Sequence, residues 1–400
     1  MSSSRPPSEP SLARPGVYEF FAGGGMARAG LEPAWDTLFA NDFDAKKARA
    51  YAENYGAERL VCGDVHALTT ADLPGRAALA WASSPCQDLS LAGKRGGLSG
   101  ARSSAFFGFW TLMQGLIAEG RAPQVIVVEN VTGLFTSHGG ADFTALCKVL
   151  SDGGYRFGAV ELDAEAHLPQ SRPRMFMIAC RDEAAPALTS REPIPWLHTP
   201  KVTAAHTRLP EDLKARWIWW RMAPAPARNL SLADILEPDD QVRWMSEEDA
   251  ARLVSLLAPL QRLRLDQILS SGERRVGAVF RRTRPSADGP VQRAEARFDG
   301  LAGCLRTPGG GSSRQFVLIA EAGNVRARQL SPREAARLMG LADDYRLPAR
   351  STNALHLLGD GVAVPVVRRL SQELLLPLIG RADLAADPHL HSSVRTKAAP

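Results

Sequence analysis

The chain contains little cysteine and no long apolar run. Five cysteines occur among 400 residues, and none forms a CxxC pair. An odd number without that spacing argues against a disulfide framework and against a zinc ribbon. No stretch of about 18 apolar residues is present, which excludes a membrane-spanning helix. The first 15 residues have no apolar core and do not read as a secretory signal. We expect a cytoplasmic protein with reduced thiols.

The sequence also lacks the bias of a disordered chain. Hydrophobic residues make up 45% and charged residues 23%, which is close to the average for globular proteins. A net charge of +5 permits a nucleic-acid partner without proving one. No group of His and Cys residues has the spacing of metal ligands, and we predict no metal.

Short apolar runs alternate with amphipathic stretches from Gly16 to about Arg181. The expected strands are Val17–Phe21, Thr37–Asn41, Ala78–Ser83, Gln124–Glu129, Arg156–Leu162 and Arg174–Ala179. The stretch that begins at Phe106 repeats apolar residues at helical spacing. This alternation predicts a doubly wound, Rossmann-like α/β sheet. The pattern weakens after Asp182, where we expect a helix over Leu253–Leu269. A final buried helix is expected over Val362–Leu378, and Ser331 is expected to cap a helix with Glu334 at its third position.

A glycine-rich turn follows the first expected strand. It reads Phe21-Ala22-Gly23-Gly24-Gly25, and such a turn lets a ligand approach the backbone closely. Arg28 stands where a dinucleotide fingerprint has its third glycine, so that motif matches poorly. Asp42 follows the next strand about 20 residues later, as a ribose-binding acid does. The alternatives are an ordinary strand–helix turn and a helix-capping aspartate.

Three further groups of polar residues stand at expected strand boundaries. Cys86 follows a strand within Ser84-Pro85-Cys86-Gln87 and precedes a polar, basic loop, which suits a thiolate nucleophile. A buried small side chain is the alternative for this cysteine. Glu129 ends a very apolar strand, where a carboxylate can have a raised pKa. Arg172 and Arg174 alternate before another strand and are able to orient a carboxylate.

In order and spacing, the set resembles the DNA (cytosine-5)-methyltransferase family over most of residues 16–182 and 303–380. The resemblance implies that Cys86 is the nucleophile, that Glu129 binds N3 of the base, and that Arg172 and Arg174 orient Glu129 and the base. It also implies that the glycine turn holds S-adenosyl-L-methionine. The implied cofactor-binding residues are Phe21, Ala22, Gly23, Gly25, Asp42, Phe43, Asp64, Val65, Pro85 and Asp360.

The same resemblance implies a partner and a division of the chain. Double-stranded DNA is the expected partner, bound with the target cytosine flipped out of the helix. The expected DNA-binding residues are Gln87, Lys94, Arg95, Arg281 and Arg282. We expect a monomer in the bacterial nucleoid, with a cognate restriction endonuclease as a further partner. The expected parts are a disordered tail (1–15), a catalytic, cofactor-binding domain (16–182), a target-recognition domain (183–340), a segment returning to the catalytic domain (341–381) and a second tail (382–400).

The chain departs from the family pattern in three places. Glu19 stands where the first motif usually has Asp, Asp360 stands where the last motif usually has Asn, and residues 183–300 match no recognition region. An RNA cytosine methyltransferase of the transfer-RNA type is one alternative, although the long insert favours DNA. A DNA-binding relative without catalysis is a second alternative. A nicotinamide oxidoreductase is more remote, because the glycine fingerprint fails.

Overall fold

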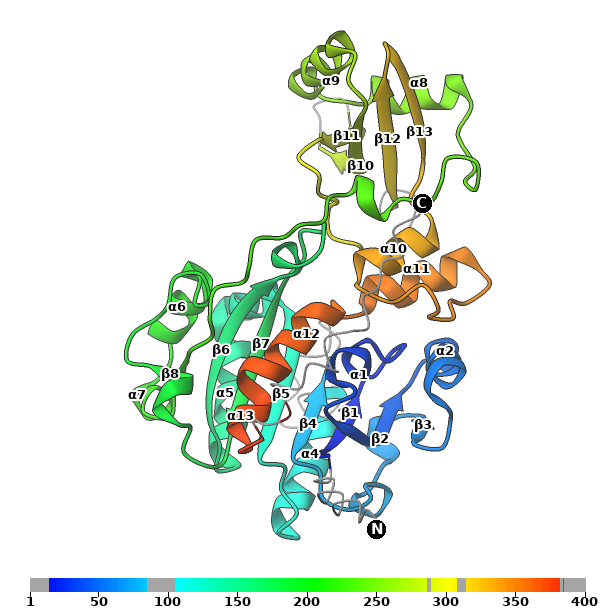
Figure 1. The fold of residues 1–400 in the computed structure, drawn as a ribbon. Helices are drawn as coiled ribbons and strands as arrows, with labels where there is room; N and C mark the ends of the chain where they lie inside the picture. The colour runs from blue at the N-terminus through cyan, green and yellow to red at the C-terminus, as the bar shows by residue number, and fades with distance from the viewer. Residues whose placement is uncertain (1–13, 85–104, 286–288, 308–313, 382–383, 385–400) are drawn as a thin grey trace, which may run out of the picture.

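The computed structural model describes residues 14–84, 105–285, 289–307, 314–381 and Leu384. These residues form two lobes, one above the other in Figure 1. A seven-stranded sheet forms the large lobe and a four-stranded sheet forms the small lobe. Among the described residues, no helix has both the length and the apolar character needed to cross a membrane.

The large sheet has the strand order β3-β2-β1-β4-β5-β7-β6. The first five strands in that order pair in parallel, and β7 pairs antiparallel with both β5 and β6. Its strands are β1 (Gly16–Phe20), β2 (Asp36–Asp42), β3 (Leu60–Cys62), β4 (Leu79–Ala82), β5 (Val125–Val131), β6 (Arg156–Asp163) and β7 (Pro173–Cys180). All six strands expected from the sequence are therefore confirmed, and so is the doubly wound α/β class.

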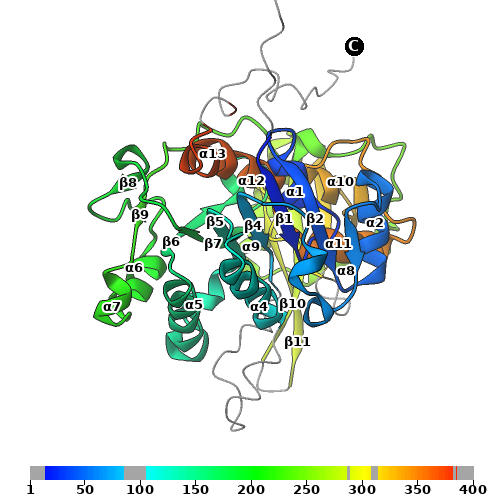
Figure 2. The ribbon, with the colours of Figure 1, turned by 90° about the horizontal axis from the view of Figure 1, so that it is seen from below.

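Helices cover both faces of this sheet, as Figure 2 shows. On one face lie α4 (Ala105–Ala118) and α5 (Ala141–Asp152). On the other lie α1 (Met26–Leu31), α12 (Val364–Leu370) and α13 (Leu376–Leu378). Strand β4 and the first four residues of β5 are apolar because both faces of these central strands are buried. Gly30 lets α1 approach α12 closely, since a Cβ there would lie 2.5 Å from the Val367 Cβ. The expected final helix is confirmed, with a π-helical stretch (Ser371–Leu375) between α12 and α13.

The chain stays with the large lobe for some distance beyond residue 183. This segment contains β8 (Thr189–Ser190), α6 (Pro200–Thr207), α7 (Glu211–Lys214) and β9 (Trp219–Trp220). It covers strand β6, where the Ile218 N–H donates to the Phe157 carbonyl at 2.7 Å. The packing thus groups residues up to about 220 with the large sheet. The predicted domain boundaries remain predictions.

The small sheet is antiparallel, with the order β11-β10-β12-β13. Its strands are β10 (Arg275–Arg284), β11 (Val291–Arg297), β12 (Gln315–Glu321) and β13 (Asn324–Gln329). Two helices, α8 (Glu247–Ser255) and α9 (Pro259–Ser271), pack on one face. The single helix expected over Leu253–Leu269 is therefore wrong. Pro259 ends it, because the residue before a proline avoids the helical conformation and Pro259 instead starts a new helix.

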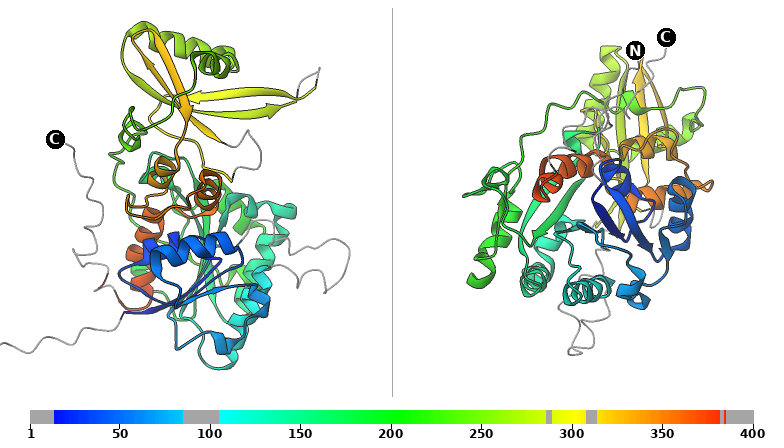
Figure 3. Two further views of the ribbon diagram at one scale, coloured as in Figure 1. Left: turned by 90° about the vertical axis from the view of Figure 1, so that its right-hand side faces the viewer. Right: turned by 60° about the horizontal axis from the view of Figure 1, so that its bottom comes forward.

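Strands β10 and β11 continue beyond the rest of the small sheet. Phe280 is the last residue of β10 that pairs with β12, whereas pairing with β11 continues to Arg284. The continuation is a two-stranded ribbon that projects to one side in the left view of Figure 3. We call residues 281–284 and 291–294 the ribbon.

Helices α10 (Pro332–Leu338) and α11 (Ser351–Asp360) lie between the two lobes (Figure 1). The expected cap of α10 is confirmed, because the Glu334 N–H donates to Ser331 Oγ at 3.1 Å and Glu334 accepts from the Ser331 N–H. Arg328 and Glu334 form an ion pair that is almost fully buried. This pair joins the end of the small sheet to α10.

Candidate active site

The glycine turn combines an open surface with two tightly packed positions. Gly23 and Gly25 have φ values of +57° and +77°, which side chains rarely adopt. A Cβ on Gly24 would lie 2.5 Å from the Tyr345 hydroxyl, and one on Gly25 would lie 2.5 Å from the Tyr55 ring. A Cβ on Gly23 would meet nothing within 4 Å. The backbone at Gly23 is therefore accessible to a ligand.

Asp42 lies directly beside this turn at the end of β2. Its Oδ2 accepts from the Gly23 N–H at 2.7 Å, and its Oδ1 accepts from the Asp44 N–H at 2.8 Å. Burial raises the pKa of Asp42, against the opposing effect of these hydrogen bonds. Asp44 rather than Asp42 caps the next helix, α2 (Ala45–Tyr55). The alternative of a helix-capping role for Asp42 is thus wrong, and its carboxylate belongs to the glycine turn.

The other expected cofactor residues surround the same edge of the sheet. Phe43 is 76% exposed, which is unusual for a phenylalanine. Asp64 accepts from the His66 N–H at 3.0 Å and caps a short helix, while the side chain of Val65 is buried in the core. Asp360 ends α11 and pairs with Lys47 of α2. Pro85 lies outside the described residues.

Glu129 ends β5 and is only 6% exposed. Its Oε1 lies 3.3 Å from Nε of Arg174, which stands at the start of the neighbouring strand β7. Burial raises the pKa of Glu129, and the charges of Arg174 and Arg172 and a hydrogen bond from Ser83 oppose that rise. Ser83 in turn accepts from Trp81 Nε1 at 2.9 Å. The carboxyl group is therefore held in place and favours its protonated form more than an exposed glutamate does.

Asn130 connects β5 to the segment that leads to Cys86. Its Nδ2 donates to the Ser84 carbonyl at 2.9 Å and to Ser84 Oγ at 3.2 Å. Ser84 is the last described residue before the Pro-Cys-Gln motif, and Asn130 holds Ser84 at the end of β5. Sequence reasoning did not give Asn130 a role, although its place between Glu129 and Val131 was a usable signal. Cys86, Gln87, Lys94 and Arg95 lie outside the described residues.

Arg172 has a different environment from Arg174. It is almost fully buried, and its guanidinium donates to the carbonyls of Leu305, Gly359 and Gly361. Arg172 thus bridges three distant segments, and its charge lowers the pKa of Glu129. That Arg172 orients Glu129 and the base stays a prediction.

Arg281 and Arg282 lie on the ribbon of the small lobe. The Arg281 guanidinium stacks 5.0 Å from the ring centre of Phe316, and that of Arg282 stacks 4.7 Å from the ring centre of Phe280. Arg282 also lies 3.5 Å from Glu295. These arginines are thus separate from the acids of the large sheet and belong to a second surface.

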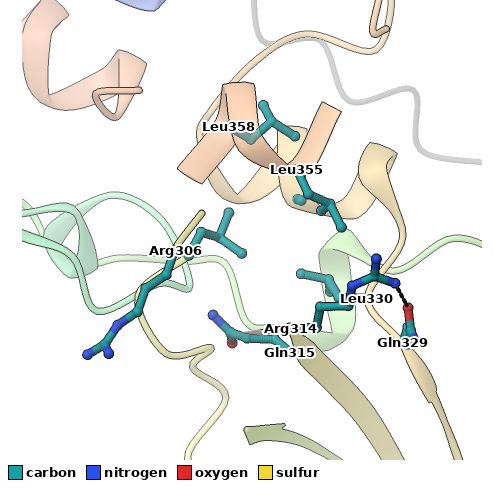
Figure 4. Close-up of a pocket in the computed structure, with 9 residues that line it drawn as sticks. Arg306, Arg314, Gln315, Gln329, Leu330, Leu355 and Leu358 are labelled. Carbon is teal, nitrogen blue, oxygen red and sulfur yellow. Dashed lines mark hydrogen bonds between the residues drawn. The ribbon is translucent and has the colours of Figure 1, made fainter. Parts of the chain in front are cut away.

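Two hollows among the described residues lie away from Glu129 and Asp42. A cavity of about 20 Å³ lies between the small sheet and helices α10 and α11 (Figure 4). Its lining includes Arg314, which donates to Gln329, and Gln315. A groove of about 550 Å³ lies between α9 and the base of β10 and β11. Within the described part of the chain, no group of three or more His, Cys, Asp or Glu residues is arranged to hold a metal.

Comparison with protein families gives a match over almost the whole chain. The model of the family described as C-5 cytosine-specific DNA methylase matches residues 16–375. The Type II methyltransferase M.NlaX of Neisseria lactamica is 25% identical over 372 residues, which cover 92% of this chain and 98% of that protein. The Type II methyltransferase M.HhaI of Haemophilus parahaemolyticus is 24% identical, with 89% and 93% covered.

Solved structures agree in fold. The Dnmt2 methyltransferase of S. pombe superposes with a TM-score of 0.57 at 18% identity, covering 92% of this chain and 99% of that one. A putative DNA modification methyltransferase encoded within an E. coli prophage gives a TM-score of 0.51 at 16% identity, with 92% and 99% covered. At these identities the likeness shows the fold alone.

Proposed function

Because the chain belongs to the C-5 cytosine-specific DNA methylase family, we propose that it methylates C5 of cytosine in duplex DNA with S-adenosyl-L-methionine as the methyl donor. One observation carries this proposal. The buried Glu129–Arg174 pair stands beside the end of β4, and Asn130 ties Ser84, two residues before Cys86, to the same place. An acid and a cation therefore stand beside Ser84, the residue from which the chain leads to the proposed nucleophile.

The residues at the glycine turn fit the cofactor. Gly23 offers accessible backbone, Asp42 offers a fixed carboxylate with lone pairs free for ribose hydroxyls, and Phe43 offers an exposed ring for the adenine. When bound, this group supplies an electrophilic methyl on a sulfonium. Asp64, at the neighbouring strand end, is a further acceptor for the adenine amino group.

The protein's own residues then activate the base. Cytosine C5 is a poor nucleophile, and addition of the Cys86 thiolate to C6 converts the ring to an enamine whose C5 can attack a methyl group. Negative charge develops on the ring during that addition. Glu129, held by Arg174 and Ser83, donates a proton or a hydrogen bond to N3 and stabilises this charge. A base, such as a solvent water, then takes the C5 proton, and the C–H electron pair re-forms the C5–C6 double bond. The sulfur–C6 bond breaks in the same step, and Cys86 leaves as a thiolate.

The ribbon is proposed as a DNA-binding element. A duplex major groove admits a two-stranded β-ribbon, and this one carries Arg281, Arg282 and Arg293. Gln87, Lys94 and Arg95 remain predicted contacts on the large-lobe side. A cognate restriction endonuclease and a monomeric state also remain predictions.

The Cys86→Ala variant tests the proposal. It should lose all detectable methyl transfer while it still binds duplex DNA, because only the nucleophile is removed. Bisulfite sequencing of plasmid from cells that express the wild type or the variant identifies both the methylated cytosines and the DNA sequence around them. Cys62→Ala removes an exposed thiol from β3 and serves as the matched control. Full methylation by Cys86→Ala, or methylation of transfer RNA in place of duplex DNA by the wild type, would contradict it.

A further inference from the structure

A single ion pair spans the rim of the proposed cofactor site. Nζ of Lys47, on α2, lies 2.6 Å from Oδ2 of Asp360, at the end of α11. The two residues are separated by 313 positions in the sequence. Lys47 follows the helix cap Asp44, which itself donates its N–H to Asp42. The pair therefore connects the ribose-site strand to the C-terminal part of the chain.

The backbone around both partners is fixed. Arg172 donates to the carbonyls on either side of Asp360, those of Gly359 and Gly361. The far end of α2 is held to the same C-terminal part, because Asn54 and Arg346 exchange side-chain and backbone hydrogen bonds of 2.8 and 3.0 Å. Asp360 thus faces Lys47 because of its backbone position and not by a chance rotamer.

Lys47 compensates for negative charge at this rim. Burial lowers the pKa of Lys47, but the hydrogen bond and charge of Asp360, with the charges of Asp42 and Asp44, raise it overall. Lys47 therefore stays protonated, and the Lys47–Asp360 pair adds no net charge. The resembling family usually has a neutral Asn at the position of Asp360.

We propose that Lys47 and Asp360 set the charge of the cofactor rim, and thereby the preference of the protein for S-adenosylmethionine over its demethylated product, S-adenosylhomocysteine. This inference rests on the proposed function. The donor carries a sulfonium charge, whereas the product is an uncharged thioether. An unpaired carboxylate at the rim would favour the donor selectively, and an unpaired ammonium would disfavour it. Both residues are specificity-determining through charge and take no part in the chemistry.

The test is a double-mutant cycle of four proteins, in which calorimetry measures the affinity of each protein for S-adenosylmethionine and for S-adenosylhomocysteine. Lys47→Met leaves Asp360 unpaired and should raise the donor-to-product affinity ratio about three- to ten-fold, the size expected for one charge several ångströms away in a partly screened site. Asp360→Asn leaves Lys47 unpaired and should lower the ratio by a similar factor. The double variant Lys47→Met/Asp360→Asn should return the ratio to the wild-type value. All shifts should shrink as salt is added.

A matched pair elsewhere provides the control. Lys148 and Asp152 form an exposed ion pair on α5, and Lys148→Met and Asp152→Asn should leave the ratio unchanged. Lys47→Arg keeps the charge and should keep the ratio, so it tests the idea even if Lys47→Met does not fold.

Two results would overturn the inference. If both single variants move the ratio in the same direction, or leave it unchanged while the wild type binds both ligands, the pair is only structural. If the wild type binds neither ligand, the proposed function itself fails, and the inference fails with it.

Discussion

Glu129 in the large lobe and Arg282 in the small lobe differ in how far their side chains are exposed to solvent. Glu129 is buried at a strand end and contacts Arg174, while Ser83 donates to it. Arg282 stands on a projecting ribbon, with 41% of its side chain exposed. Asp42 follows the first pattern, and Arg293, directly opposite Arg282 in the strand pairing, follows the second.

This difference in burial is consistent with a catalytic role for Glu129 and a DNA-binding role for Arg282. Burial shifts the pKa of a carboxyl group and fixes its position, which suits proton sharing with a reacting base. Exposure keeps an arginine charged and adaptable, which suits a polyanion. Two arginines directly opposite each other repel in the free protein, and a phosphate backbone would relieve that repulsion. Variants in the two lobes should therefore change different measurements.

The largest effect is expected for Glu129→Gln. Loss of a positioned general acid typically costs 10²- to 10⁴-fold in rate, and about that fall in kcat is expected here. Affinity for DNA and its salt dependence should not change, because the small lobe is intact. Single-turnover methylation with radiolabelled donor measures the rate. Glu211→Gln, on the exposed helix α7, is the control. A variant with wild-type kcat would remove Glu129 from the chemistry.

A second large effect concerns Glu19, which lies in β1 behind the glycine turn. Burial raises the pKa of Glu19 to about 8 from an ordinary 4.5, against hydrogen bonds from the Arg28 N–H and Tyr51. The folded state thus holds a proton that the unfolded chain releases above pH 4.5. The contribution of Glu19 to stability is complete below that pH and is lost as the pH rises through about 8.

Denaturant unfolding of wild type and Glu19→Gln between pH 4 and 9 measures this loss. Glutamine cannot titrate, so the variant should gain stability relative to wild type with rising pH, by up to about 1.4 kcal/mol per pH unit. The gain should stop near pH 8. Glu192→Gln, in an exposed loop, should show no such trend. A pH-independent difference would mean that Glu19 is ionised in the folded protein.

The large lobe could be predicted from the sequence because its signals are local. A buried parallel strand is a short apolar run bounded by turn residues, so β1, β4 and β5 could be predicted from their own residues. The cap at Ser331 is local as well. Each of these depends on fewer than ten consecutive residues.

The remainder depends on contacts that no local pattern encodes. Arg172 reaches carbonyls 133 to 189 positions away, and its alternation with Arg174 gives no sign of these partners. The Lys47–Asp360 pair is equally remote in sequence. Pro259 indicated the break between α8 and α9, but the apolar residues on both sides of it have helical spacing and suggested one continuous helix. The small sheet has edge and surface strands rich in arginine, whose polar sequence resembles a loop.

A smaller effect is expected for Asp42→Ala. The variant loses the carboxylate that is proposed to accept hydrogen bonds from the ribose hydroxyls, and loss of such a partner costs about 1–3 kcal/mol. We expect that loss in the calorimetric binding of S-adenosylmethionine, with DNA affinity unchanged. Asp36→Ala, at the exposed start of the same strand, is the matched control. Equal cofactor affinity in both variants would place the ribose elsewhere.

The smallest effect per residue is expected on the ribbon, and there the comparison predicts two opposite signs. Arg282→Ala and Arg293→Ala should each weaken DNA binding a few-fold and reduce the slope of log affinity against log salt by about one. Without DNA, Arg293→Ala should be more stable than wild type by a few tenths of a kcal/mol, because the cross-strand repulsion is gone. Arg282→Ala also loses its contacts with Phe280 and Glu295 and should gain less. Arg262→Ala, on α9, removes an exposed arginine away from the ribbon and should change neither. A ribbon variant that loses stability but keeps the wild-type salt slope would show that these arginines support the small sheet and do not contact phosphates.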